Sequence, residues 1–375
     1  MLGFNKPYFT GKELDYIRDA VAREKLSGNG YYTQQCQHFF TSRYGFRKAL
    51  LAQSCTDALE MSALLMEVGP EDEIILPSFT FVSTANAFAL RGAKLVFADC
   101  EENIPNMDMD HVSQLITPRT KAIVAVHYAG VACDMDRLME LANKHNLMVV
   151  EDAAQAIDGY YKGRPLGSIG HLACFSFHET KNIISGEGGM LVINDQRFAD
   201  RAEVIWEKGT NRSAFFRGEV DKYSWIDLGS SFLPSEITAA FLWAQLLEID
   251  DIQRKRLAVW NRYYEGLQIL MKDGHLALPF IPPFATNNAH MFYVVCRSAD
   301  ERNALMAHLK AQEIQAIFHY LPLHNSPYFQ SQYKGRDLTK TNRYSACILR
   351  LPFYTELTIP EIDRVIKSIH QFYNS

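Results

Sequence analysis

Short apolar segments alternate with helical patterns along residues 1–240 of this chain. Helical spacing is found in Glu13–Glu24, Ser54–Val68, Ser83–Leu90 and Asp134–His145. The apolar runs of strand length are Glu73–Leu76, Lys94–Ala98, Ala122–His127, Leu147–Val150, Ala173–Phe177 and Met190–Ile193. Strands that alternate with helices are typical of α/β proteins, so we predict an α/β fold with a mostly parallel central sheet.

The pattern changes near Leu242, where a long amphipathic helix is expected to run as far as Leu267. A proline-rich break follows at Pro279–Pro283. The segments expected after it are a strand at Met291–Val295, a helix at Asp300–Gln312, a strand near Gln315–His319 and a helix at Pro360–Phe372. We therefore predict a large α/β domain over residues 1–240. A linking helix and a small α+β domain are expected over residues 241–375.

Composition excludes several classes of protein. The chain has 375 residues, of which 47% are hydrophobic, so it can bury a substantial core. Its net charge is −5 and no block of basic residues stands out, which argues against a nucleic-acid partner. The 7 cysteines form no Cys-x-x-Cys pair, so we expect reduced thiols and no zinc site. No apolar run reaches membrane-spanning length, and we expect a cytoplasmic protein without a membrane partner.

Two charged residues follow predicted strands. Asp152 comes directly after Leu147–Val150 and Glu151, and Lys181 lies on a loop after Ala173–Phe177. Ligands of such sheets bind outside the carboxyl ends of the strands. A lysine there could form an imine with pyridoxal phosphate, and the aspartate could keep the ring nitrogen protonated. Each residue also has an ordinary interpretation, as a solvated lysine and as an acid that caps a turn.

A phosphate group would need a separate binding site. Ser54, Cys55 and Thr56 stand at a predicted helix start, where free backbone N–H groups and the helix dipole favour an anion. The alternative is that Ser54 or Thr56 only caps the helix. Ser176 could add a hydroxyl group. Phe81 could offer an aromatic face to a cofactor ring, although core packing would explain a phenylalanine equally well.

With these residues in place, the chain resembles the sugar-nucleotide aminotransferases of the DegT/DnrJ/EryC1/StrS family. The most specific marks are Glu151–Gln155, Ser176–Asn182 and Gly186–Gly189. The resemblance runs almost from end to end, from Pro7 to Tyr320–His324. It implies the fold of aspartate aminotransferase, which is fold type I of pyridoxal-phosphate enzymes.

The resemblance also implies the cofactor, pyridoxal 5'-phosphate, and the residues that hold it. Lys181 would be the Schiff-base lysine, Asp152 would pair with the pyridinium nitrogen, and Gln155 would bond the ring hydroxyl. Phe81 would stack on the ring. The phosphate would be held by Thr56, Ser176 and the backbone at Cys55.

The likeness is greatest to family members that act on a TDP-linked keto-sugar. It implies conversion of TDP-4-keto-6-deoxy-D-glucose to TDP-4-amino-4,6-dideoxy-D-galactose, with L-glutamate as amino donor, for enterobacterial common antigen or O-antigen. A homodimer with active sites at the subunit interface is implied too. His319, Tyr320 and His324 would face the sugar, or else be polar residues of a strand end. Open alternatives are the 4-amino gluco epimer, a 3-amino sugar, or a catalytically silent regulatory or scaffold protein.

One segment departs from the family pattern. Most members carry Gly-x-Asn-x-Arg, in which the Asn reaches the cofactor phosphate of the neighbouring subunit. Here Ser231 occupies the Asn position and Leu233 the Arg position. Because Ser231 is shorter, a water molecule or Ser230 would have to assist a phosphate contact. The galactose-forming members look alike here, so the departure favours that subgroup.

Overall fold

A computed structural model describes residues 1–374 and contains a central sheet of 7 strands in the order β1-β9-β8-β5-β4-β2-β3. Only β9 runs antiparallel to its neighbours, so the predicted mostly parallel sheet is confirmed. The strands are β1 (Lys48–Ala52), β2 (Glu73–Pro77), β3 (Lys94–Ala98), β4 (Thr120–Val126), β5 (Met148–Asp152), β8 (Leu172–Ser176) and β9 (Gly189–Ile193). The edge strand β1 was not predicted.

Helices cover both faces of this sheet, because successive strand side chains point to opposite faces. Ile75 and Ile123 pack on one side, whereas Ile74 and Ala122 pack on the other. The first face is covered by α2 (Tyr31–Tyr44), α5 (Met109–Leu115), α6 (Met135–His145) and α9 (Glu236–Leu247). The second is covered by α3 (Cys55–Leu65), α4 (Val82–Ala89) and α7 (Ala199–Trp206). The layers are therefore helix, sheet and helix, as an α/β fold requires.

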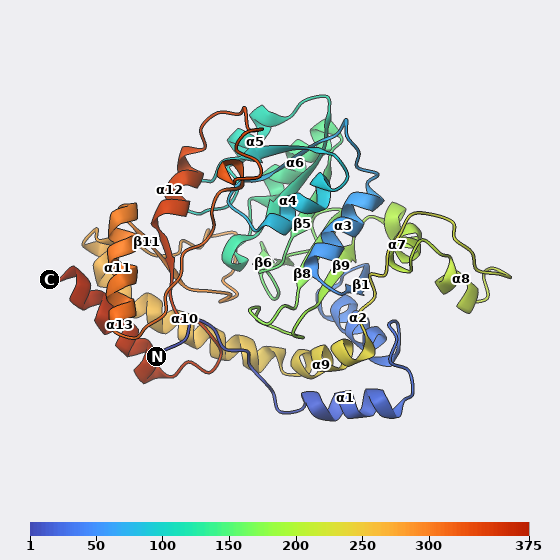
Figure 1. Ribbon diagram of the computed structural model, residues 1–375, viewed down its shortest axis with the longest axis horizontal. Coiled ribbons are helices and arrows are strands. Elements are labelled where there is room, and N and C mark those ends of the chain that lie inside the picture. Colours follow the sequence, from blue (N-terminus) through green and yellow to red (C-terminus); the bar gives the residue numbers. More distant parts are fainter. Residues whose placement is uncertain (375) are drawn as a thin grey trace.

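A second sheet of three strands lies beside α11, and the long helix α10 runs below both this sheet and the central one (Figure 1). Helices α11 and α13 pack with this sheet and with α10 around a third core. The elements are α10 (Ile249–Lys272), β10 (Leu276–Ala277), β11 (Tyr293–Cys296), α11 (Ala299–Ala311), α12 (Thr339–Cys347), β12 (Ile348–Arg350) and α13 (Ile359–Tyr373). The strand predicted near Gln315–His319 is wrong, since only a single bridge between Ile317 and Arg350 forms there.

Short elements complete the chain. α1 (Glu13–Ala22) packs against α9, and α8 (Arg212–Phe216) lies on a segment that projects from the body (Figure 1). The others are β6 (Tyr160–Tyr161), β7 (Arg164–Pro165) and three 3₁₀ turns, Tyr128–Gly130, Gln196–Phe198 and Leu323–Asn325. Across residues 1–374, the structure has no helix both long and apolar enough to span a bilayer.

The division into two domains stays a prediction. The expected boundary at residue 240 falls inside α9, and α9 contacts α1 and α2 of the large part. The third core instead begins in α10 with Leu257 and Val259, and it also includes Leu2 from the start of the chain. We propose that the boundary lies within α10.

Candidate active site

The residues expected to hold a cofactor meet at the carboxyl edge of the central sheet. Asp152 is the last residue of β5 and Ser176 is the last residue of β8, two strands that pair in parallel. Lys181 follows β8 in a tight turn, where its backbone N–H donates to the carbonyl of His178 at 2.9 Å. Asp152 and Ser176 lie there because each ends a buried strand, and Lys181 because it lies on the turn that follows β8.

The Asp152 carboxylate is buried, with 6% of the residue exposed. It accepts hydrogen bonds from the Thr84 hydroxyl at 2.7 Å and from the Ala154 N–H at 3.2 Å. Thr84 in turn lies 2.8 Å from the Thr80 hydroxyl. Burial raises the pKa of Asp152 against the opposing effects of these bonds and of the Lys181 charge. A cationic partner such as a ring N–H would therefore stabilise this carboxylate.

The Lys181 amine has no hydrogen-bond acceptor among the residues that the structure describes. Burial lowers its pKa, and the positive charge of Arg350 lowers it further, against the opposing effects of Cys55 and Asp152. A half-buried lysine with a lowered pKa is a candidate nucleophile and proton carrier. The structure thus brings Lys181, Asp152 and Cys55 within electrostatic reach of one another.

The start of α3 forms the anion-binding end of the site. Ser54 caps the helix by accepting the N–H of Asp57 at 3.0 Å, so the capping interpretation holds for Ser54. The N–H groups of Cys55 and Thr56 belong to the first turn and precede any intrahelical acceptor. The Thr56 hydroxyl donates to Ser83 at 2.8 Å.

A glycine allows β9 to run directly against this helix start. A Cβ atom on Gly189 would lie 2.4 Å from the Cys55 nitrogen and 2.2 Å from the Ser54 carbonyl carbon. Real side chains do not make such contacts, so residue 189 must be glycine for strand and helix to approach this closely. Ser176, which pairs with Gly189 across the sheet, lies on the same side of the site.

Aromatic side chains lie around Gln155, the residue expected to bond the cofactor ring. Gln155 accepts the Ala129 N–H at 2.6 Å and donates to the Tyr320 hydroxyl at 3.2 Å. The Tyr320 and Phe81 ring centroids are 6.3 Å apart, and Phe81 is 57% exposed at the head of α4. His319 bonds the Tyr128 hydroxyl at 3.2 Å, and burial lowers its pKa well below the ordinary value.

Two predicted residues are not brought to Lys181 within one chain. His324 is buried, with Nδ1 2.7 Å from the Ser78 hydroxyl and its ring 5.0 Å from that of Tyr333. Ser231 is exposed, and its carbonyl accepts from the Gln53 side chain. The roles of His324 and Ser231 in binding stay predictions.

Sequence patterns did not identify the groups that support the site. Both Glu151 and His127 are fully buried and bond each other at 3.0 Å, beside Asp152. Because His127 Nδ1 accepts the Cys133 N–H, its Nε2 carries the proton and donates to Glu151. Next to Lys181, the Asn182 amide bonds His290 at 2.8 Å. Glu151 and Asn182 belong to the motifs that carry the family resemblance, which was the available signal.

These residues fit pyridoxal phosphate. The unpartnered amine of Lys181, the buried Asp152 carboxylate and the free N–H groups at the start of α3 match the aldehyde, the ring nitrogen and the phosphate in turn. The cradle beside Gly189 has no room for a side chain of its own.

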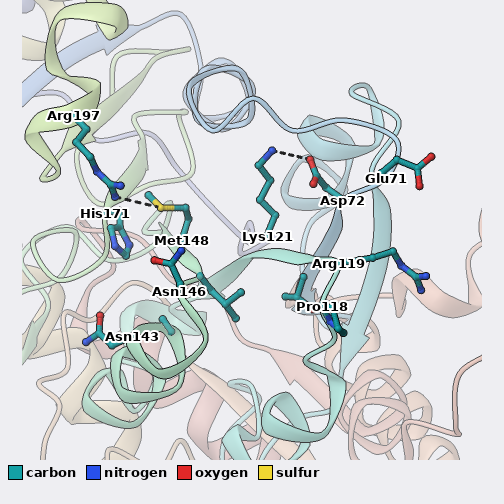
Figure 2. Close-up of a pocket in the computed structure, with 13 residues that line it drawn as sticks. Glu71, Asp72, Pro118, Arg119, Lys121, Asn143, Asn146, Met148, His171 and Arg197 are labelled. Carbon is teal, nitrogen blue, oxygen red and sulfur yellow. Dashed lines mark hydrogen bonds and ion pairs between the residues drawn. The ribbon is translucent and has the colours of Figure 1, made fainter.

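The opposite edge of the sheet contains a pocket. Figure 2 shows a pocket of about 560 Å³ near the amino ends of β4 and β5. Its cations already have partners, because Lys121 bonds Asp72 at 2.9 Å and Arg197 pairs with Asp195 at 2.6 Å. This pocket therefore lacks the free reactive groups found around Lys181.

Fold and site together define a pyridoxal-phosphate aminotransferase. The chain belongs to the DegT/DnrJ/EryC1/StrS aminotransferase family, whose model matches residues 7–370. The enzymes of this family depend on pyridoxal phosphate, so the predicted cofactor and the predicted enzyme class are confirmed.

Individual relatives align over nearly their full length. Spore coat polysaccharide biosynthesis protein SpsC of Bacillus subtilis is 33% identical, with 98% of this chain and 96% of the relative covered. GDP-perosamine synthase of Escherichia coli O157:H7 is 29% identical, with 98% of each covered. The crystal structure of DesV from S. venezuelae superposes with a TM-score of 0.91 at 29% identity, covering 100% of this chain and 99% of that one. The chain is therefore a sugar aminotransferase.

Proposed function

We propose that this enzyme transfers the amino group of L-glutamate to TDP-4-keto-6-deoxy-D-glucose and forms TDP-4-amino-4,6-dideoxy-D-galactose. The product would enter a surface polysaccharide, such as enterobacterial common antigen or an O-antigen. The observation that carries the proposal is the pairing of half-buried Lys181 with buried Asp152 at the carboxyl edge of the sheet. The relatives in spore coat polysaccharide and GDP-perosamine synthesis support the substrate class.

Lys181 would hold and move the proton of the reaction. Its lowered pKa makes the amine a better proton acceptor than an exposed lysine at the same pH, and positioned proton transfer contributes roughly 10²–10⁴ in rate. Pyridoxal phosphate, when bound, supplies the electron sink that makes this proton removable. Asp152, fixed by the Thr84 hydroxyl, would pair with the ring nitrogen at the far end of that sink.

The remaining site residues would orient the cofactor and the substrate and enclose them. The N–H groups at Cys55 and Thr56, with the Ser176 hydroxyl, would bind the phosphate at the positive end of α3. Gln155 would bond the ring hydroxyl, and Phe81 would cover the ring. Tyr320 and neutral His319 would meet the sugar. His324 would act on the substrate through the loop that it anchors to Ser78.

We further propose a homodimer with active sites at the subunit interface. The segment around α8 exposes large apolar side chains that a second copy could cover. They are Phe216 at 69%, Tyr223 at 55%, Trp225 at 78%, Ile226 at 55% and Leu228 at 54%. Ser231 follows this segment directly, and in a dimer it could approach the partner's phosphate with the help of water or Ser230.

Proton NMR of the product made from TDP-4-keto-6-deoxy-D-glucose and L-glutamate tests the proposal. An axial 4-amine, recognised by its small ring couplings, supports the galactose product. Large couplings at the same carbon would identify the gluco epimer, and amination at the neighbouring carbon would identify a 3-amino sugar. A protein that never develops a visible cofactor band would instead fit a silent regulatory or scaffold protein.

A further inference from the structure

Asn288 is a buried residue of the segment before β11, and hydrogen bonds engage both ends of its side-chain amide. Nδ2 donates to the carbonyls of Gln155 at 2.7 Å and Ile157 at 2.9 Å. Oδ1 accepts the backbone N–H of His290 at 3.1 Å. The Asn288 side chain therefore ties the turn after β5, which carries Gln155, to the segment that leads into the small sheet.

The backbone beside Gln155 packs tightly on this amide. A Cβ atom on Gly130 would lie 1.9 Å from Asn288 Oδ1, so the close approach requires glycine. Directly before it, the Ala129 N–H donates to Gln155 Oε1 at 2.6 Å. Because Oε1 is engaged, the Gln155 amide nitrogen, which donates to Tyr320 at 3.2 Å, is the group left to donate to a cofactor ring.

The backbone carbonyl of Asn288 accepts hydrogen bonds from the turn that carries Lys181. Asn182, the residue after the lysine, donates to the Asn288 carbonyl at 2.8 Å and to Gln253 Oε1 at 2.9 Å. Gln253, on α10, donates in turn to the Asn288 carbonyl at 3.3 Å. One residue therefore joins the turns after β5 and β8, the two parallel strands that end at the site.

His290 completes this network as a neutral donor. Since both hydrogens of the Asn182 amide are used, its Oδ1 accepts, and the 2.8 Å bond there comes from the Nδ1–H group of His290. Burial lowers the pKa of His290 well below the ordinary value, and nearby positive charges, including that of Lys181, lower it further. The ring is therefore uncharged near neutral pH, and the network keeps the same donors and acceptors there.

Asn194 provides the comparison, because its side chain makes the same kind of bonds elsewhere. Its Nδ2 donates to the carbonyls of Gly167 and Gly170, both at 2.8 Å. Asn194 follows β9, which runs antiparallel to its neighbours, so it lies at the edge of the sheet opposite Lys181. Asn194 therefore fixes a turn that carries none of the expected cofactor residues, whereas Asn288 fixes the turn that carries Gln155.

We propose that Asn288 is a positioning residue of the reaction, which holds Gln155 at a fixed distance from Lys181. The inference rests on the roles that the proposed function gives to these two residues, and it adds a residue that acts only through them. Gln155 and Lys181 must reach the same ring from two different turns. A displacement of about 1 Å in such a site can cost on the order of 10² in rate. The bonds from Asn288 to the Gln155 turn prevent that displacement.

The test compares Asn288→Ser and Asn288→Ala holoenzymes with wild type, using Asn194→Ser as the matched control. With L-glutamate alone, loss of the visible cofactor band reports the donor half-reaction. We expect its maximal rate to fall about tenfold in Asn288→Ser and on the order of 10²-fold in Asn288→Ala. Half-saturation by glutamate should stay within about twofold, because the donor makes no contact with Asn288. Asn194→Ser should lower the unfolding midpoint and leave the rate unchanged.

A double-mutant cycle tests whether Asn288 acts through Gln155. In a Gln155→Ala background, Asn288→Ser should lower the rate by no more than about twofold, because the side chain that it positions is absent. A pH titration of the visible band needs no substrate. Losing the bond from Gln155 to the ring oxygen disfavours the charged form of that oxygen. The band should therefore titrate about 0.5–1 pH unit higher in both Asn288→Ser and Gln155→Ala.

Equal rate losses in the two backgrounds, an unshifted titration, or a matching rate loss in Asn194→Ser would each overturn the inference. If Asn288→Ala does not fold, Asn288→Ser gives the same decision. A wild type that reacts with glutamate but does not aminate the TDP-sugar would refute the proposed substrate alone. A wild type that does not react with glutamate would refute the proposed donor, and the band titration would still decide the role of Asn288.

Discussion

The Thr84 hydroxyl donates a 2.7 Å hydrogen bond to the Asp152 carboxylate, across 68 positions of sequence. The Thr84 oxygen lies 2.8 Å from the Thr80 hydroxyl and can accept a hydrogen bond from it. Two threonines of one segment therefore fix the position of the Asp152 carboxylate. The bond favours the charged carboxylate and opposes the effect of burial on its pKa.

Replacing Thr84 with Val should therefore raise the pKa of Asp152. Because the ring nitrogen needs an ionised partner, the acid limb of the kcat/KM profile should move to higher pH, and kcat/KM should fall roughly tenfold near pH 7. The pH–rate profile measures this. Thr80 reaches Asp152 only through Thr84, so Thr80→Val should shift the acid limb less. Equal shifts in the two variants would contradict this series of hydrogen bonds.

Replacing Lys181 with Ala should abolish turnover, with kcat reduced by roughly 10³-fold or more, because the proton carrier is lost. The visible band that the cofactor forms with the lysine should disappear from the absorbance spectrum. Lys144→Ala, at an exposed position on α6, serves as the matched control. Full activity in the Lys181 variant would disprove the mechanism.

Replacing Gly189 with Ala should push β9 and the start of α3 apart, because the new methyl group would overlap the Ser54–Cys55 peptide. We expect a loss of about 1–3 kcal/mol in stability and weaker retention of the cofactor during dialysis. Gly69→Ala introduces the same methyl group where nothing lies within 4 Å, so it should change neither property. Cofactor retention equal to wild type in Gly189→Ala would contradict the packing argument.

Glu73 predicts a pH dependence of stability at the other edge of the sheet. Burial disfavours its charge, but bonds from Lys94, Thr117 and Arg119 lower its pKa from 4.5 to about 2. The folded-state pKa is the lower one, so the stabilisation is present above the unfolded value and is lost as pH falls through the folded value.

The full difference would amount to roughly 3 kcal/mol, and the exposure of Lys94 and Arg119 reduces it to about 1–2 kcal/mol. Urea unfolding of Glu73→Gln should show this loss at about pH 7 and progressively less toward about pH 3. A loss that does not vary over that interval would mean that packing, and not charge, is responsible.

Local sequence was enough to predict the parts of the site that follow strands. Asp152 and Lys181 could be recognised because a buried apolar run ends before each, and Ser54 because it stands at a helix start. Thr84 carries no local signal of this kind. Its importance arises only because the fold brings α4 to the end of β5, where Thr84 bonds Asp152.

Tertiary contacts also explain the errors. Gln315–His319 contains a short apolar run, but its backbone bonds go to two separate segments, from Gln315 to Leu2 and from Ile317 to Arg350, so no strand forms. The helix expected over Glu13–Glu24 forms as α1, but its Leu14 and Val21 side chains are 72% and 51% exposed, so helical spacing did not tell which residues would be buried. The contact between His324 and Ser78 could not be predicted from sequence either, and the role of His324 in substrate binding stays a prediction.

The bond between Ser78 and His324 joins positions 246 residues apart, and Arg350 comes later still. During synthesis, the central sheet with Lys181 and Asp152 emerges from the ribosome long before the segment that contains Tyr320 and Arg350. Contacts this distant in sequence form late, since a long loop must close first. The nascent chain therefore contains Lys181 and Asp152 before the segment with Tyr320 and His324 has been made, and the contacts between these two parts are among the last to form.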